Sequence, residues 1–219
     1  MLVFVSFPTT RLDHFIVSTI EEMMTNSKST ILTAIRRHHL SEAALPDLDQ
    51  SWIQFSDLRA QFAAVLESVG GRAVMVADAT MLNSELSKIS EWRDAKESVS
   101  LVGGVRGNVD LALINDAHAT ETIDFAILPG EFAVAENGAV WVSDLNVKHR
   151  AIFFIAQHLA LVVPSSNLVS NMHEAYRRLS FDAPSFGAFI SGPSKTADIE
   201  QSLVIGAHGP RSMTVFIVG

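Results

Sequence analysis

The chain has 219 residues, and its hydrophobic content of 48% is enough for the core of one large domain or two small ones. The net charge of −8 and the scattered placement of 16 Lys and Arg residues exclude the concentrated basic face that nucleic acid requires. With no cysteine, the chain forms no disulfide and offers no thiolate to an iron–sulfur cluster or a cysteine-ligated zinc ion.

The hydropathy of the chain predicts a cytoplasmic protein. No apolar run approaches the ~20 residues that span a bilayer. Met1 to Phe7 is apolar but lacks the basic region of a secretory signal. A polar stretch follows Met23 and Met24, so translation starting at either methionine is an alternative for the first residues.

Residues 1–45 are predicted to form an N-terminal extension with one amphipathic helix, Ser29–His39. Its apolar residues fall at helical spacing, and basic residues occupy its last turn. The adjacent His38 and His39 invite a metal interpretation, but neighbouring side chains on a helix diverge by about 100°. We expect these histidines to complement the helix dipole instead.

Residues 46–219 alternate between helical patterns and short apolar runs. The predicted helices are Leu58–Val69, Leu82–Ile89, Ala151–Gln157 and Leu168–Leu179, the last capped by Ser165 or Ser166. The predicted strands are Ala73–Ala77, Val99–Val102, Phe125–Leu128, Phe132–Ala135, Ala139–Ser143, Leu159–Val163, Phe186–Ile190 and Met213–Val218. Asp110–Ile114 fits either a helix or a strand.

This alternation predicts an α/β domain with a helix-covered mixed sheet, a three-layer helix/mixed sheet/helix architecture. Asn137-Gly138 between two apolar runs predicts an antiparallel hairpin, because both residues tolerate positive φ. The loop Gly103–Gly107 matches neither the P-loop nor the dinucleotide-binding spacing, so we interpret it as a connection rather than a phosphate cradle.

Three segments resemble a known protein family. Gly192 to Gln201 (GPSKTADIEQ), followed by Gly206 to Arg211 (GAHGPR), is similar to the C-terminal signature of the LUD-domain lactate-utilisation family, LutC type. Phe132 to Val140 (FAVAENGAV) and Ile31 to Arg36 (ILTAIR) resemble two further segments of that family, so the resemblance spans most of the chain after about Ser27.

The resemblance implies a fold of the NagB/RpiA/CoA transferase-like superfamily. It also implies a function, as a component of a lactate-utilisation system that supports the oxidation of L-lactate to pyruvate with iron–sulfur partner proteins. Since this chain lacks cysteine, any such cluster belongs to a partner. We expect no covalently bound cofactor.

Glu136 is the candidate catalytic residue. Glu136-Asn137-Gly138 is similar to the glutamate-centred segment of coenzyme A transferases, and a partly desolvated carboxylate on a turn could act as a nucleophile or general base. The alternative is an ordinary solvent-exposed glutamate.

The signature segment supplies the other candidate site residues, in a polar turn between a strand and a predicted helix. Lys195 could pair with a carboxylate or phosphate, or it could pair with Asp198 or Glu200 while hydroxyls cap the helix. His208 could act as an acid/base or a ligand, or it could hydrogen-bond to backbone. The candidate ligand-binding residues are Asn137, Gly138, Ser191, Gly192, Ser194, Lys195, Thr196 and His208.

The remaining histidines show no ligand spacing, so the sequence predicts no metal site. We expect Glu136 and the signature turn to line one site at the ends of the sheet strands, where open α/β folds place ligands. Two alternative functions stay open. One is a coenzyme A transferase-like or sugar-phosphate isomerase-like enzyme acting on a small carboxylate, thioester or sugar phosphate, and the other is a non-catalytic interaction module.

Overall fold

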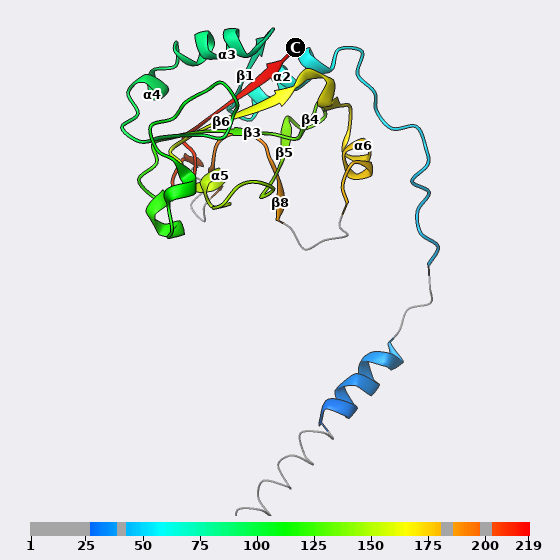
Figure 1. The fold of residues 1–219 in the computed structure, drawn as a ribbon. Coiled ribbons are helices and arrows are strands. Elements are labelled where there is room, and N and C mark those ends of the chain that lie inside the picture. Colours follow the sequence, from blue (N-terminus) through cyan, green and yellow to red (C-terminus); the bar gives the residue numbers. More distant parts are fainter. Residues whose placement is uncertain (1–26, 39–42, 181–185, 198–202) are drawn as a thin grey trace, which may run out of the picture. The chain divides into compact units, whose positions relative to one another are not determined.

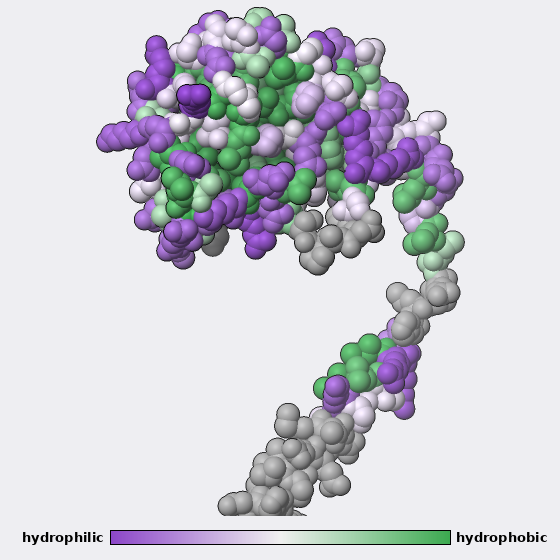
Figure 2. Space-filling view, viewed as in Figure 1, coloured by the Kyte–Doolittle hydropathy of each residue, from purple (hydrophilic) through white to green (hydrophobic). Residues whose placement is uncertain are grey.

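A computed structural model describes residues 27–38, 43–180, 186–197 and 203–219 of the chain. The chain divides into two compact units, Met1–Gln50 and Ser51–Gly219. The first unit contains a helix over residues 27–37, whose Ile31 and Ile35 side chains are both 60% exposed. Figure 2 shows the apolar and polar residues of this helix on different sides, as its amphipathic sequence predicts.

A parallel sheet of five strands forms the centre of the second unit (Figure 1). In spatial order the strands are β1 (Arg72–Val76), β11 (Ser212–Val218), β6 (His158–Pro164), β3 (Phe125–Pro129) and β2 (Ser98–Ser100). The central strands are apolar at nearly every position because both of their faces are buried, which is typical of parallel sheets.

One face of the parallel sheet packs against α3 (Ala79–Leu86) and α4 (Ser90–Arg93), which follow β1 in the chain (Figure 1). The Asp78 side chain caps the first of these helices by accepting hydrogen bonds from the backbone N–H groups of Thr80 and Met81. The core on this face includes the buried residues Leu82, Leu86, Phe125, Ile127 and Phe216.

The opposite face packs against α2 (Leu58–Ser68), α5 (Ile152–Ile155) and a second sheet. The strands of this second sheet are, in order, β7 (Leu168–Val169), β4 (Phe132–Val134), β5 (Ala139–Ser143) and β8 (Gly187–Ile190). The larger core includes the fully buried Phe62 and Leu66 of α2 and Phe153 of α5. The helix α6 (Met172–Arg177) packs on the second sheet through another buried cluster, which includes Val134 and Ala175.

The predicted α/β architecture, in which helices flank a sheet, is confirmed, but the central sheet is parallel throughout rather than mixed. The Asn137-Gly138 hairpin is also present, since β4 and β5 pair antiparallel with Phe132 opposite Trp141. It lies in the second sheet rather than at an edge of the first. Asp110–Ile114, whose sequence fits either a helix or a strand, contains a 3₁₀ turn at Leu111–Leu113. Two more such turns occupy Ala117–Thr120 and Ser165–Asn167.

Two helix predictions differ from the structure, one in its start and the other in its type. Leu168 and Val169 pair with β4 as the strand β7, so the helix begins only at Met172 and is capped by Asn171. After the signature turn the chain forms β9 (Lys195–Ala197), which pairs antiparallel with β10 (Leu203–Ile205), in place of a helix. In both places pairing with a distant segment overrides the local helical pattern.

The described residues include no helix that is both long and apolar enough to span a bilayer.

Candidate functional site

The two segments singled out by the resemblance meet in the structure. The Ser191 hydroxyl donates a 2.8 Å hydrogen bond to the backbone oxygen of Asn137. The Asn137 side-chain oxygen accepts from the backbone N–H of Ala139, which closes the hairpin turn. The end of β8 is thereby fixed to the tip of the β4–β5 hairpin.

Both segments also pack closely against α2, and each contact requires a glycine. Gly138 has a φ of +64°, and a Cβ added there would lie 2.9 Å from the backbone nitrogen of Leu66. Gly192 has a φ of +74°, and its added Cβ would lie 2.6 Å from the carbonyl oxygen of Val69. Only glycine satisfies both the positive φ and the close approach.

Five of the candidate residues line one cleft of about 330 Å³, and these are Ser191, Gly192, Ser194, Lys195 and His208. Both backbone polar groups of Ser194 form hydrogen bonds within the protein. Its N–H donates to the backbone oxygen of Pro210 at 2.8 Å, and its oxygen accepts from the Gly206 N–H at 2.9 Å. The side chains of Lys195 and His208 are exposed. Thr196 lies in β9, opposite Val204, while Asp198 and Glu200, the acids weighed as partners of Lys195, fall outside the described residues.

This cleft, which we call the signature cleft, lies at the amino ends of the parallel strands. A neighbouring cleft of about 570 Å³ shares His208 with it and is also lined by Gln157 and Arg211. Those two residues directly precede β6 and β11, and the Arg211 N–H donates to the Gln157 oxygen at 2.7 Å. Open α/β sheets usually bind ligands at the other edge, beyond the carboxyl ends of the strands.

Glu136 is exposed and turns toward α6. One of its carboxylate oxygens accepts a 2.8 Å hydrogen bond from the backbone N–H of Met172, the first residue of that helix. Its own N–H donates to the oxygen of Ser170. Glu136 is not among the residues that line the signature cleft, although the next residue, Asn137, is bonded to that cleft through Ser191.

The carboxyl ends of the parallel strands carry the larger cavity, about 730 Å³ in volume. It is lined by the last residues of three strands, Pro129, Pro164 and Val218, and by Arg178 after α6. This site was not predicted from the sequence, because Arg178 belongs to no motif and only the fold brings it to the strand ends. The available signals were Pro129-Gly130 and Pro164, which mark where two predicted strands stop.

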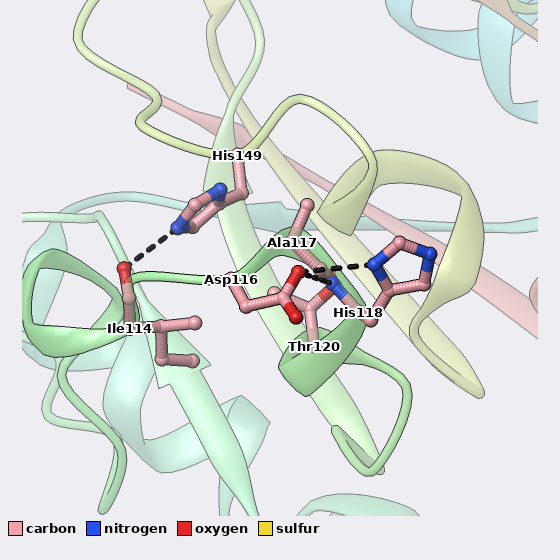
Figure 3. Close-up of polar contacts among 6 residues, drawn as sticks. All are labelled: Ile114, Asp116, Ala117, His118, Thr120 and His149. Atoms are coloured by element: carbon pink, nitrogen blue, oxygen red, sulfur yellow. Dashed lines mark hydrogen bonds and ion pairs between the residues drawn. The ribbon is translucent and has the colours of Figure 1, made fainter.

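The histidines and acids of the described residues form no metal centre, since no three or more of them are placed to hold an ion. Figure 3 shows His118 and His149 pointing in different directions on either side of Asp116. His149 bonds to the Ile114 oxygen at 2.8 Å, whereas His118 pairs with Asp116 at 3.0 Å. The hydrogen bond to Asp116 raises the pKa of His118.

His158, at the first position of β6, is half-buried. Burial lowers its pKa, because the charged ring loses solvation. Its Nδ1 lies 2.8 Å from the Ser212 hydroxyl on the neighbouring strand. It lines a separate cleft of about 360 Å³ with acidic neighbours that include Glu91 and Asp124.

Comparison with known proteins agrees with the resemblance seen in the sequence. Residues 115–218 match the family model of the LUD domain, a range that includes Glu136 and the signature cleft. The solved structure of a DUF162 family protein from Deinococcus radiodurans has the same fold, with a TM-score of 0.52 and 18% identity over 74% of this chain and 96% of that one.

Several proteins called lactate utilization protein C are similar to the chain. The one from Geobacillus kaustophilus is 31% identical over 172 residues, or 74% of this chain and 67% of that protein. The one from Geobacillus thermodenitrificans is 29% identical over 88% of this chain and 80% of that protein. The matches to the proteins of Shouchella clausii and Halalkalibacterium halodurans, 36% and 38% identical, span under half of those proteins, 45% and 42% of their length. This chain belongs to the LUD-domain family of lactate utilization protein C.

Proposed function

We propose that this chain is a component of a lactate-utilisation system and supports the oxidation of L-lactate to pyruvate together with iron–sulfur partner proteins. The observation that carries the proposal is the 31% identity over 172 residues with a lactate utilization protein C. The LUD-domain match supports it, since the matched range contains the whole signature cleft.

The chemistry of the reaction requires a partner protein in addition to this chain. Converting L-lactate to pyruvate removes two electrons and two protons, and the electrons need an acceptor. Iron–sulfur clusters are held mainly by cysteine thiolates, and this chain has no cysteine. The proposed acceptor is therefore a cluster on a partner protein, and the share of this chain is ligand binding and assembly.

The signature cleft is the proposed contact site for a small carboxylate or phosphate. Lys195 supplies a positive charge at its wall, and His208 supplies a ring that can donate or accept a hydrogen bond. The glycines at positions 138 and 192 let the hairpin tip and the turn before Lys195 lie against α2, which gives that turn a rigid support.

Co-purification tests this assignment. The tagged full chain, recovered from its native host, is expected to bring down cysteine-rich proteins identified by mass spectrometry, with iron in the recovered complex. Lys195→Ala is expected to reduce lactate-dependent electron transfer by the complex, whereas Lys96→Ala, another exposed lysine that lies outside the signature cleft, serves as the matched control. Recovery of the chain alone and without iron would contradict the proposal.

A second candidate function, that of a coenzyme A transferase-like enzyme, draws on the position of Glu136. Its carboxylate is exposed and oriented by the Met172 N–H, as a carboxylate that attacks a thioester must be. The purified chain would then turn over an acyl thioester, with loss of activity in Glu136→Gln and none in Glu67→Gln, an exposed control on α2. Turnover of a sugar phosphate in place of a thioester would indicate the isomerase-like alternative, and absence of any turnover favours the complex component or an interaction module.

A further inference from the structure

The cavity at the carboxyl ends of the parallel strands has the position of a ligand site. The last residues of β3, β6 and β11 line it, as does Ala79 at the start of α3. Open α/β sheets bind ligands at this edge. Its volume of about 730 Å³ lies inside the range of small-molecule sites, which is roughly 300–1,000 Å³.

The walls of this strand-end cavity are mainly apolar. Leu82 of α3, Val102 after β2, Phe132 of β4 and Val162 of β6 contribute side chains from four separate elements. Figure 2 shows apolar residues over the part of the visible face where the parallel strands lie, with polar residues around them. Such walls favour the hydrocarbon part of a ligand.

Arg178 is the single cation among the described residues that line the cavity. Its guanidinium carbon lies 5.7 Å from the centroid of the Phe132 ring, a cation–π contact. No acidic side chain of the described residues forms an ion pair with it. The ring contact places the guanidinium at the cavity, and guanidinium N–H groups are suited to bind a carboxylate.

The surrounding polar groups limit the charge of a ligand. Glu131 lines the same cavity, and its carboxylate accepts a hydrogen bond from the Ser143 hydroxyl. The N-terminus of α3 is already capped by Asp78, so it adds little for a phosphate. One arginine beside one glutamate suits a monoanion and disfavours a polyphosphate.

The size of the cavity points beyond lactate, because a three-carbon acid would leave most of the volume empty. We propose that the strand-end cavity binds an aliphatic monocarboxylic acid of medium chain length, with its carboxylate on Arg178 and its hydrocarbon chain against the apolar walls. This site is separate from the signature cleft and does not depend on the proposed lactate function.

Titration of the full chain with acetate, butyrate, hexanoate and octanoate, followed by ligand-observed NMR, tests the proposal. Each methylene buried contributes about 0.8 kcal/mol, so affinity should rise about fourfold per methylene until the cavity is filled. Octanamide, which has the same length without the charge, should bind about tenfold more weakly or worse.

Substitutions locate the binding. Arg178→Gln should weaken octanoate about tenfold or more and leave octanamide nearly unchanged, while Arg178→Lys should retain part of the preference for the acid. Arg177→Gln, which removes the neighbouring exposed arginine outside the cavity lining, is the control and should bind octanoate like the unmodified chain. Circular dichroism checks that each variant is folded.

Four results would overturn the proposal. One is equal affinity for octanoate and octanamide, another is affinity that does not rise with chain length, and the third is octanoate binding that survives Arg178→Gln unchanged. Lactate binding the cavity as tightly as octanoate would also overturn it. None of these results bears on the co-purification of iron–sulfur partners.

Discussion

Gly192→Ala tests whether the signature glycine is required by the fold itself. An alanine at the Gly192 φ of +74° costs about 1–2 kcal/mol. Its Cβ would also lie 2.6 Å from the Val69 oxygen and 3.1 Å from the Val69 Cγ2, and overpacking of this kind costs about 1–3 kcal/mol. The expected loss in the free energy of unfolding is therefore about 2–5 kcal/mol, a large part of the stability of a typical domain.

Urea unfolding, followed by tryptophan fluorescence, measures this loss. Trp141 is a suitable reporter, since its ring centroid lies 4.7 Å from that of Phe189 inside the second sheet. Gly104→Ala is the matched control, because Gly104 has a φ of +80° but an added Cβ meets nothing within 4 Å. It should cost only the backbone strain of about 1–2 kcal/mol.

Gly103→Ala supplies a baseline, because this residue has neither a positive φ nor a neighbour within 4 Å of the added Cβ. We expect a change of less than about 1 kcal/mol, in either direction. The contact with α2 is refuted if Gly192→Ala loses no more stability than Gly104→Ala. In that case the glycine would have to be explained by a ligand that approaches its backbone.

Three further predictions concern single side chains. Asn171→Ala should lower the free energy of unfolding by about 1–2 kcal/mol, because the Asn171 side chain caps α6 by accepting a 3.0 Å hydrogen bond from the Glu174 N–H. A loss below about 0.5 kcal/mol in urea unfolding would contradict this. Asp116→Asn should lower the pKa of His118 toward its ordinary value of 6.5 in an NMR titration, and an unchanged pKa would show that the pair does not form in solution. Any stabilisation from the raised pKa is present below pH 6.5 and is lost as the pH rises through the folded-state pKa. For His158 the sign is opposite, because burial lowers its pKa and the unfolded chain binds the proton more readily. Stability should therefore fall as the pH drops below about 6.5, and His158→Gln should flatten this pH dependence of the free energy of unfolding. Equal slopes for the variant and the parent chain would refute this prediction.

The central strands of this protein were predictable because burial on both faces leaves a continuous apolar run. The apolar run Met213–Val218, for example, predicts a strand, and β11 starts one residue earlier, at Ser212. The β4–β5 hairpin was predictable for a different reason, since Asn-Gly specifies its own turn. Both signals are local, and both survive in the fold.

The misjudged segments depend on pairing between distant residues. Leu168 and Val169 fit a helical stripe with the residues after them, yet they hydrogen-bond with β4, more than thirty positions earlier in the chain. Lys195–Ala197 likewise pairs with β10 rather than starting a helix. No local pattern contains these partners, so periodicity alone could not identify the strands.

The candidate site residues also include some that the sequence identifies and one that only the folded structure places. The family resemblance includes Asn137 and begins again at Gly192, directly after Ser191, and the structure joins Ser191 to Asn137 by a hydrogen bond. Arg178 could not be found in that way, because an isolated exposed arginine is unremarkable in a sequence. Its place beside Phe132 follows from the packing of α6 on the second sheet.

The signature cleft and the strand-end cavity lie toward opposite ends of β6, although a wall residue of one, Phe189, contacts a wall residue of the other, Phe132, with ring centroids 6.0 Å apart. The seven residues of β6 run from His158 at one edge to Pro164 at the other, and at a rise of about 3.3 Å per residue they span roughly 20 Å. No metabolite as short as lactate bridges that span, so the energetic effects of changing Lys195 and Arg178 should simply add. Octanoate binding curves of a Lys195→Ala protein should accordingly superimpose on those of the parent chain.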